Sequence, residues 1–160
     1  WRTIEQNASL ALEVRNKRND ELVNTLLEEF GLTKFKNNLP HELSGGMRQR
    51  LSFLRATLSG SNVLLLDEPF SALDAMTKLF MQEWLLQQWE KRKATILFIT
   101  HDISEALFLS DRILVVTETP ITTLKEFTVP LKRPRKREDL DKEDVLSLKN
   151  HLIDQFRMRT

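Results

Sequence analysis

Three short aliphatic runs alternate with helical patterns in this sequence, and they limit its fold more than any other feature. The runs cover 63–66, 96–99 and 113–116, and each is bounded by polar or turn-forming residues. Such runs are typical of strands that are buried on both faces of a sheet. Because helical patterns separate the runs, the sequence predicts an α/β fold with a mostly parallel sheet.

The first forty residues have helical periodicity. Ile4, Ala8 and Leu12 predict one helix, since they recur at helical spacing. A second helix is predicted to start at Asp20 and to end at Gly31, a residue that suits a C-terminal cap. This N-terminal part is therefore expected to be helical throughout.

Further elements are predicted along the rest of the chain. Helices are expected over 44–58, over 103–107, and from an N-cap at Asp74, the last with Met76, Phe80 and Trp84 on one face. A hairpin or edge strand is expected between Pro120 and Pro130, and then a helix with Val145, Leu148 and Leu152 on successive turns.

The composition excludes several classes of protein. The 160 residues are 41% hydrophobic, and 24 Lys and Arg against 23 Asp and Glu give a net charge of +1. Disorder is therefore not expected, and the charge balance gives no general reason for a nucleic-acid partner. There is no Cys for disulfides, and no apolar run approaches the roughly 20 residues of a membrane span. No signal peptide is visible either, so a cytosolic protein is expected. Because the chain does not begin with Met, we expect it to be a piece of something longer.

A Ser-Gly-Gly segment is predicted to open the helix over 44–58. Leu43 precedes Ser44, Gly45 and Gly46. A helix N-terminus presents unpaired N–H groups and partial positive charge, and glycines allow a phosphate to approach the backbone closely. The alternative interpretation is an ordinary Ser N-cap with glycine in the loop.

Two carboxylates follow the first aliphatic run. Asp67 and Glu68 stand at the end of the predicted strand, where α/β proteins bind ligands. Asp67 is a candidate Mg²⁺ ligand, because hard cations prefer oxygen ligands. Glu68 is a candidate to orient and polarise an attacking water. The alternative is an acidic turn before Pro69.

Two weaker signals follow in the chain. Ser71 to Asp74, read alone, is a helix cap. His101 comes directly after the strand over 96–99, where it could contact a γ-phosphate or help to align a water. A lone loop His is more often a solvated or capping residue.

The order of these four segments resembles the ATP-binding subunit of ABC transporters over essentially the whole chain. The resemblance implies that Leu43 to Gln49 is the family signature, with Ser44, Gly45 and Gly46 at the γ-phosphate of ATP bound by the opposite subunit. Many family members have Gln where this chain has Met47, so no nucleotide contact is assigned to Met47.

The same resemblance assigns the remaining site residues. Asp67 is the Walker B carboxylate that serves Mg²⁺, and Glu68 is the catalytic carboxylate. Asp74 ends the D-loop, which crosses the dimer interface, and His101 is the switch histidine. ATP and Mg²⁺ are the implied cofactors.

The family's phosphate-binding loop is missing from the sequence. Gly31, Gly45, Gly46 and Gly60 are the only glycines, and none is followed by Lys, so no G-x-x-x-x-G-K-[S/T] motif is present. The resemblance therefore predicts an N-terminally truncated P-loop NTPase-like domain. Its parts would be a helical subdomain portion over 1–43, the signature helix and ATPase core over 44–118, and a C-terminal strand, charged linker and amphipathic helix over 119–160.

The C-terminal part resembles one group of bacterial importers. Val129-Pro130-Leu131, followed by a charged stretch and a helix, is similar to the subunits for nitrate, sulfonates, taurine and thiamine precursors. The implied partners are a membrane permease, a second ATP-binding subunit in a homodimer and, indirectly, an external solute-binding protein. No nucleic-acid partner is implied. The implied location is the cytoplasmic face of the cell membrane.

Two other functions stay open at this stage. One is a soluble ABC ATPase that acts on DNA or ribosomes, although such relatives usually carry an acidic residue after LSGG and long insertions. The other is a non-enzymatic fragment, which the missing P-loop favours. The basic run over 132–137 is followed by five acidic residues, and we interpret it as a solvated, self-paired linker.

Overall fold

The computed structural model describes residues 1–116, 118 and 120–157. The elements in chain order are α1 (Ile4–Val14), α2 (Asp20–Glu29), α3 (Gly45–Leu58), β1 (Val63–Asp67), α4 (Ala75–Arg92), β2 (Thr95–Ile99), α5 (Ile103–Leu109), β3 (Arg112–Val116), β4 (Leu124–Thr128) and α6 (Glu143–Arg157). Short 3₁₀ helices cover Thr33–Phe35, Pro40–Glu42 and Arg137–Asp141. The chain forms two compact units, over 1–99 and 100–160, and each is described by itself.

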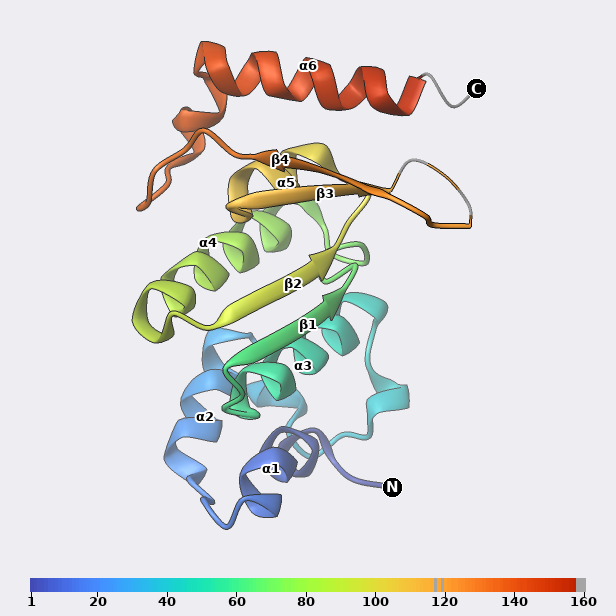
Figure 1. The fold of residues 1–160 in the computed structure, drawn as a ribbon. Coiled ribbons are helices and arrows are strands. Elements are labelled where there is room, and N and C mark those ends of the chain that lie inside the picture. Colours follow the sequence, from blue (N-terminus) through green and yellow to red (C-terminus); the bar gives the residue numbers. More distant parts are fainter. Residues whose placement is uncertain (117, 119, 158–160) are drawn as a thin grey trace. The chain divides into compact units, whose positions relative to one another are not determined.

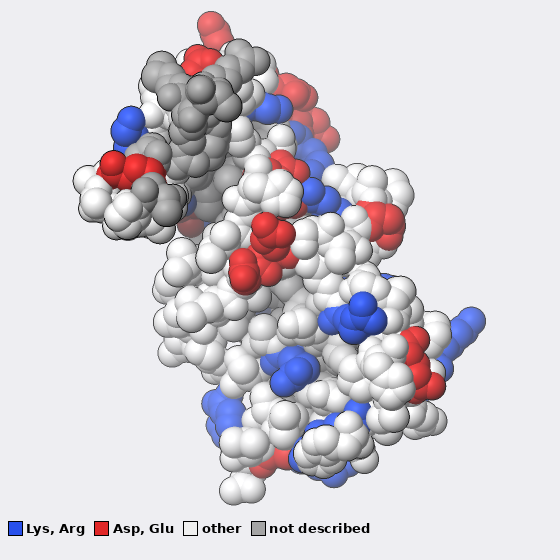
Figure 2. Space-filling model, turned by 90° about the vertical axis from the view of Figure 1, so that its right-hand side faces the viewer, with Lys and Arg blue, Asp and Glu red and all other residues white. Residues whose placement is uncertain are grey.

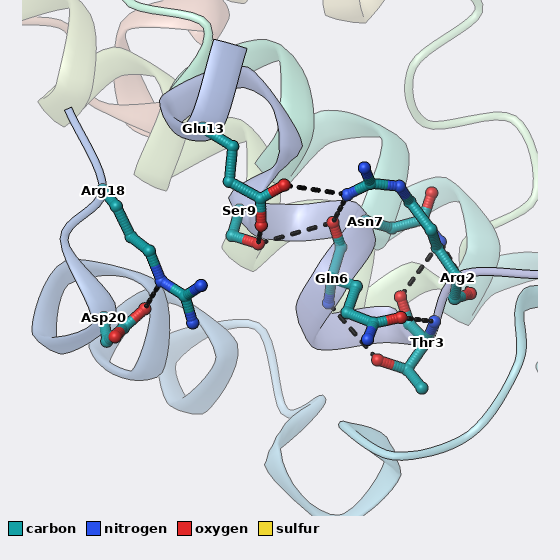
Figure 3. Close-up of polar contacts among 8 residues, drawn as sticks. All are labelled: Arg2, Thr3, Gln6, Asn7, Ser9, Glu13, Arg18 and Asp20. Atoms are coloured by element: carbon teal, nitrogen blue, oxygen red, sulfur yellow. Dashed lines mark hydrogen bonds and ion pairs between the residues drawn. The ribbon is translucent and has the colours of Figure 1, made fainter. Parts of the chain in front are cut away.

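Helix α1 begins at a capping box. The Thr3 hydroxyl accepts the N–H of Gln6, and the Gln6 side chain accepts the N–H of Thr3. Arg2 and Ser9 both donate to the Glu13 carboxylate, over 2.9 and 2.7 Å (Figure 3). Side-chain hydrogen bonds from Arg2 and Ser9 hold the pKa of Glu13 below its usual value. The start of the first unit is thus fixed by polar contacts between α1 and the two residues that precede it.

The predicted helical periodicity of this region is confirmed. Ile4, Ala8 and Leu12 are buried along one side of α1. Helix α2 ends where it was expected, because Gly31 follows it with a φ of +64°. The Arg50 guanidinium of α3 donates to a carbonyl at this end of α2.

An aromatic cluster forms the centre of the first unit. Phe30, Phe53, Phe70 and Trp84 are all at most 5% exposed, and Phe30 packs edge-on against Trp84 with ring centroids 4.8 Å apart. The Trp84 indole donates to Glu29 over 2.7 Å. The cluster joins α2, α3 and α4 to the turn after β1, so this turn is anchored in the core.

Strands β1 and β2 pair in parallel, with Val63 opposite Thr95 and Asp67 opposite Ile99 (Figure 1). The prediction that these runs are buried on both faces is wrong for the described structure. Leu65 is 71% exposed while its neighbour Leu66 is 9% exposed. Side chains alternate between the two faces of a strand, and α3 packs against β1 on the buried side. The exposed face carries Val63, Leu65, Leu97 and Ile99.

The predicted face of α4 is also wrong in part. Trp84 is buried, but Met76 is 74% and Phe80 48% exposed, and the buried side of the helix includes Met81 and Leu85. Residues spaced by four along a helix turn about 40° further at each step. Residues 76, 80 and 84 therefore do not share one face of α4, and only Trp84 lies on its buried side.

The second unit has a core of its own. The segment between Pro120 and Pro130 contains one strand, β4, which confirms the edge-strand alternative of the prediction. Strand β4 pairs antiparallel with β3, the third aliphatic run. The core of this unit consists of buried residues from α5, β3, α6 and the segment after β4, namely Leu107, Val115, Val129, Leu131, Val145 and Leu152. Phe127 packs against this core from β4. The structure is thus mixed α/β, with one parallel and one antiparallel strand pair.

The interpretation of 132–137 as a solvated linker is wrong for two of its arginines. Arg135 is buried, and its guanidinium donates to the carbonyl of Ser110 over 2.7 Å and to that of Leu131 over 3.1 Å. Arg133 donates to the Leu109 carbonyl and to Asp111. The carbonyls at the end of α5 lack helical partners, and the two arginines satisfy them.

The surface carries charges of both signs. Figure 2 shows Lys and Arg side chains interspersed with Asp and Glu on one face, with uncharged surface between them. None of the described helices combines the length and the apolar character that a membrane span requires.

Candidate functional site

The Ser-Gly-Gly segment lies at the start of α3, as predicted. Ser44 is the N-cap, and its hydroxyl oxygen accepts the N–H of Met47 over 3.3 Å. Ser44 and Gly45 are exposed, and Gly46 is half-buried. The capping role of Ser44 is therefore observed, while the backbone at this helix start faces solvent with the partial positive charge that suits a phosphate.

The two carboxylates lie at the end of β1. Asp67 is the last residue of the strand and pairs with Ile99 of β2. Glu68 follows in the left-handed region with a φ of +42°, and its N–H donates to the Ile99 carbonyl over 2.9 Å. Both residues are exposed, so both carboxylates are accessible at the carboxyl end of the parallel pair.

The D-loop segment forms the turn between β1 and α4. Asp74 is the N-cap of α4 and accepts the N–H of Thr77 over 3.0 Å. Hydrogen bonds from the Thr77 side chain, and then from its backbone, hold the pKa of Asp74 below its usual value. The helix-cap interpretation of Asp74 is therefore observed, and its predicted contact with nucleotide stays a prediction.

The structure brings the signature segment and the D-loop together. A Cβ added at Gly46 would lie 3.0 Å from the Ala72 carbonyl oxygen, and one at Gly45 would lie 3.9 Å from the Ala72 Cβ. The start of α3 therefore rests on the turn that follows Glu68. Six of the seven predicted site residues thus belong to the first unit: Ser44, Gly45, Gly46, Asp67, Glu68 and Asp74.

His101 belongs to the second unit and is exposed. The residues on either side of it are held in place. The Thr100 hydroxyl donates to Glu105 over 2.5 Å and accepts the N–H of Asp102, and Asp102 caps α5. The backbone at His101 is thus fixed within its own unit, and its predicted contact with phosphate stays a prediction.

Sequence reasoning gave no role to Gln49, whose side chain contacts the turn after β1. Its Nε2 donates to the Glu68 carbonyl over 2.6 Å, and its Oε1 accepts the N–H of Ala72 over 2.9 Å. The resemblance placed Gln49 inside the signature, but a lone amide on a helix gives no local signal of what it contacts.

The fit of a metal rests on a single carboxylate. Among the described residues there is no group of three or more His, Cys, Asp or Glu side chains that could hold an ion. Mg²⁺ in nucleotide sites is typically held by one or two carboxylates together with waters and substrate phosphates. An exposed Asp67 at the strand end fits that donor set, provided that a phosphate supplies the other ligands.

Comparison with known proteins defines the class. The family model described as "ABC transporter" matches residues 1–71. A solved inward-facing metal-chelate type ABC transporter aligns with 93% of this chain at a TM-score of 0.62, and this chain spans 58% of that one. Its sequence identity is 19%, so this likeness shows the fold alone.

Curated relatives extend the match over most of the chain. The formylaminopyrimidine import ATP-binding protein of Halalkalibacterium halodurans is 47% identical over 89% of this chain and 58% of its own length. An aliphatic sulfonates import ATP-binding protein of Pseudomonas syringae is 47% identical over 87% of this chain and 59% of its own length. The nitrate import ATP-binding protein of Synechococcus elongatus is 44% identical over 86% of this chain and 53% of its own length.

Residues 1–71 thus match the ABC transporter family model, and the relatives that match most of the chain are ATP-binding proteins of importers. The predicted resemblance and the predicted α/β fold class are thereby confirmed. The chain spans only 53% to 59% of the length of the three relatives named above.

Proposed function

We propose that this chain is part of the subunit that binds and hydrolyses ATP to energise an ABC importer of a small solute. The observation that carries the proposal is the packing of the signature helix start against the turn that follows Asp67 and Glu68. The printed functions of the relatives, which concern a formylaminopyrimidine, aliphatic sulfonates and nitrate, support a small solute.

Each site residue has a role in this proposal. Glu68 accepts a proton from, and orients, the water that attacks the γ-phosphate. Asp67 holds Mg²⁺, which neutralises charge on the phosphates. Ser44, Gly45 and Gly46 present N–H groups to the ATP of the opposite subunit.

Two further residues complete the proposed site. Asp74 fixes the D-loop at the dimer interface, and His101 contacts the γ-phosphate. Because the signature acts on nucleotide held by the opposite subunit, the proposed assembly is a homodimer docked on a permease at the cytoplasmic face of the membrane. An external solute-binding protein would deliver the solute, and no nucleic acid takes part.

The 160 residues alone are expected to be inactive. They contain no P-loop motif, and phosphoryl transfer depends on positioning and electrostatic stabilisation of the phosphates. We therefore expect no tight ATP binding and no turnover by this chain in isothermal titration and phosphate-release assays. Turnover that Glu68→Gln abolishes would contradict this expectation. A non-enzymatic fragment is the alternative that the missing motif favours.

The complete ATPase that contains this chain provides the positive test. Glu68→Gln should leave ATP binding within about twofold and lower kcat by at least about 100-fold, because the general base is lost. Glu90→Gln, the same chemical change at an exposed position of α4 outside the proposed site, is the matched control and should hydrolyse ATP like the wild type. Equal hydrolysis by Glu68→Gln and the wild type would refute the proposed role.

A further inference from the structure

The side chain of Gln49 spans the turn that follows β1. Its amide nitrogen donates to the Glu68 carbonyl over 2.6 Å and to the Ser71 hydroxyl oxygen over 3.3 Å, while its amide oxygen accepts the N–H of Ala72 over 2.9 Å. Ser71 itself donates to the Glu68 carbonyl. One amide therefore binds both ends of the turn over 68–72 to helix α3.

The close approach of Gly46 to the same turn is a second contact. A Cβ at this position would lie 3.0 Å from the Ala72 carbonyl oxygen and 3.6 Å from Leu73 Cδ2. Gly46 and Gln49 lie about one helical turn apart on α3, so this helix contacts the segment over 68–72 at two points. The turn cannot shift along α3 without breaking one of them.

Glu68 lies at the point where these constraints meet. Its N–H donates to Ile99 of β2, and its carbonyl accepts from Gln49 of α3. Its φ of +42° is uncommon for a residue with a side chain, and such a conformation persists only where the surroundings fix it. The backbone of Glu68, and with it the direction of its Cα–Cβ bond, is thus held by β2 on one side and by α3 on the other.

We propose that Gln49 is a positioning residue, which fixes the backbone of Glu68 to the signature helix and so sets where the Glu68 carboxylate points. This proposal rests on the proposed function, because it assigns the carboxylate of Glu68 to the reaction. It means that a displacement of α3 is transmitted to Glu68 through a single side-chain amide.

The first experiment measures the contacts in the 160-residue chain. Gln49→Met keeps the length of the side chain and removes both kinds of hydrogen bond, whereas Gln49→Glu keeps the acceptor for Ala72 and removes the donor to Glu68. Arg55→Met, at an exposed position of α3, is the matched control. Backbone amide exchange at Ala72 should become at least about tenfold faster in Gln49→Met and stay near wild type in the other two.

The second experiment measures catalysis in the complete ATPase. Both Gln49 variants should lower kcat by about 10- to 100-fold with the KM for ATP unchanged within twofold, because misplacement of a catalytic group affects the chemical step. Arg55→Met should match the wild type. A simple loss of folding would instead lower the fraction of active protein, which active-site titration reports.

Two results would overturn the proposal. One is wild-type exchange at Ala72 in Gln49→Met, and the other is an unchanged kcat in both Gln49 variants. Failure of the proposed function would look different, because the complete wild-type protein would then hydrolyse no ATP.

Discussion

Replacing Arg135 by Met should destabilise the second unit by about 3 kcal/mol. The change removes the donors to the carbonyls of Ser110 and Leu131, and a buried carbonyl without a partner costs about 1 to 3 kcal/mol. The longer contacts to Leu107 and Phe108, of 3.4 and 3.2 Å, add less. Loss of the ion pair between Arg135 and Asp111 adds little to this cost, because the Asp111 side chain is 60% exposed and keeps its ion pair with Arg133. Removal of a buried charge offsets part of the loss, since burial also lowers the pKa of Arg135.

The assay must report on the second unit. The three Trp residues stand at 1, 84 and 89, so Trp fluorescence follows the first unit only. Amide exchange at Ile113 and Phe127, which pair across the hairpin, reports the opening of the second unit. Lys132→Met is the matched control, because it removes one positive charge from an exposed position of the same run and should change stability by less than about 0.5 kcal/mol. Equal effects of the two substitutions would refute the capping role of Arg135.

Three further predictions concern the first unit. Leu65→Lys should change the free energy of unfolding, measured in urea, by less than about 0.5 kcal/mol, whereas Leu66→Lys should lower it by more than about 3 kcal/mol, because only Leu66 is buried. Similar effects of the two substitutions would contradict the exposed sheet face. Trp84→Phe should cost about 1 to 3 kcal/mol through the lost bond to Glu29, measured by the same unfolding curves, and a neutral effect would deny that bond any weight. The pKa of Asp74 is lower in the folded state than in the unfolded state, so the ionised carboxylate stabilises the fold above the unfolded-state pKa, and this stabilisation is lost as the pH falls through the folded-state pKa. Asp74→Asn should therefore make the free energy of unfolding fall less steeply as the pH is lowered. An unchanged fall would contradict this prediction.

The sequence could predict features that depend on near neighbours in the chain. The capping of α4 by Asp74 and the end of α2 at Gly31 follow from the backbone preferences of those residues. The position of Asp67 and Glu68 at a strand end follows from the abrupt stop of an aliphatic run. In each case the groups that interact lie within a few residues of one another.

Burial could not be predicted in the same way. Leu65 and Leu66 have the same side chain, and only the placement of α3 on one side of β1 makes one exposed and the other buried. Arg135 lies among charged residues, which indicated solvation, yet the carbonyls that it satisfies come from the end of α5. The chemistry of that site depends on a helix end that lies more than 20 residues earlier in the chain, since the Ser110 contact spans 25.

The contacts of Gln49 show where sequence reasoning about the candidate site reaches its limit. They join residues that are 19 to 23 positions apart, and two of the three partners, the Glu68 carbonyl and the Ala72 N–H, are backbone groups, which give no signal in the sequence. A motif can therefore assign Glu68 a role, because its carboxylate is distinctive, but it cannot show what holds that carboxylate in place. In an enzyme that works by positioning, the residues that hold a catalytic group matter nearly as much as the group itself. Under the proposed function the signature helix has two tasks: its exposed start offers N–H groups to a phosphate, and Gln49 on its second turn holds the backbone of Glu68.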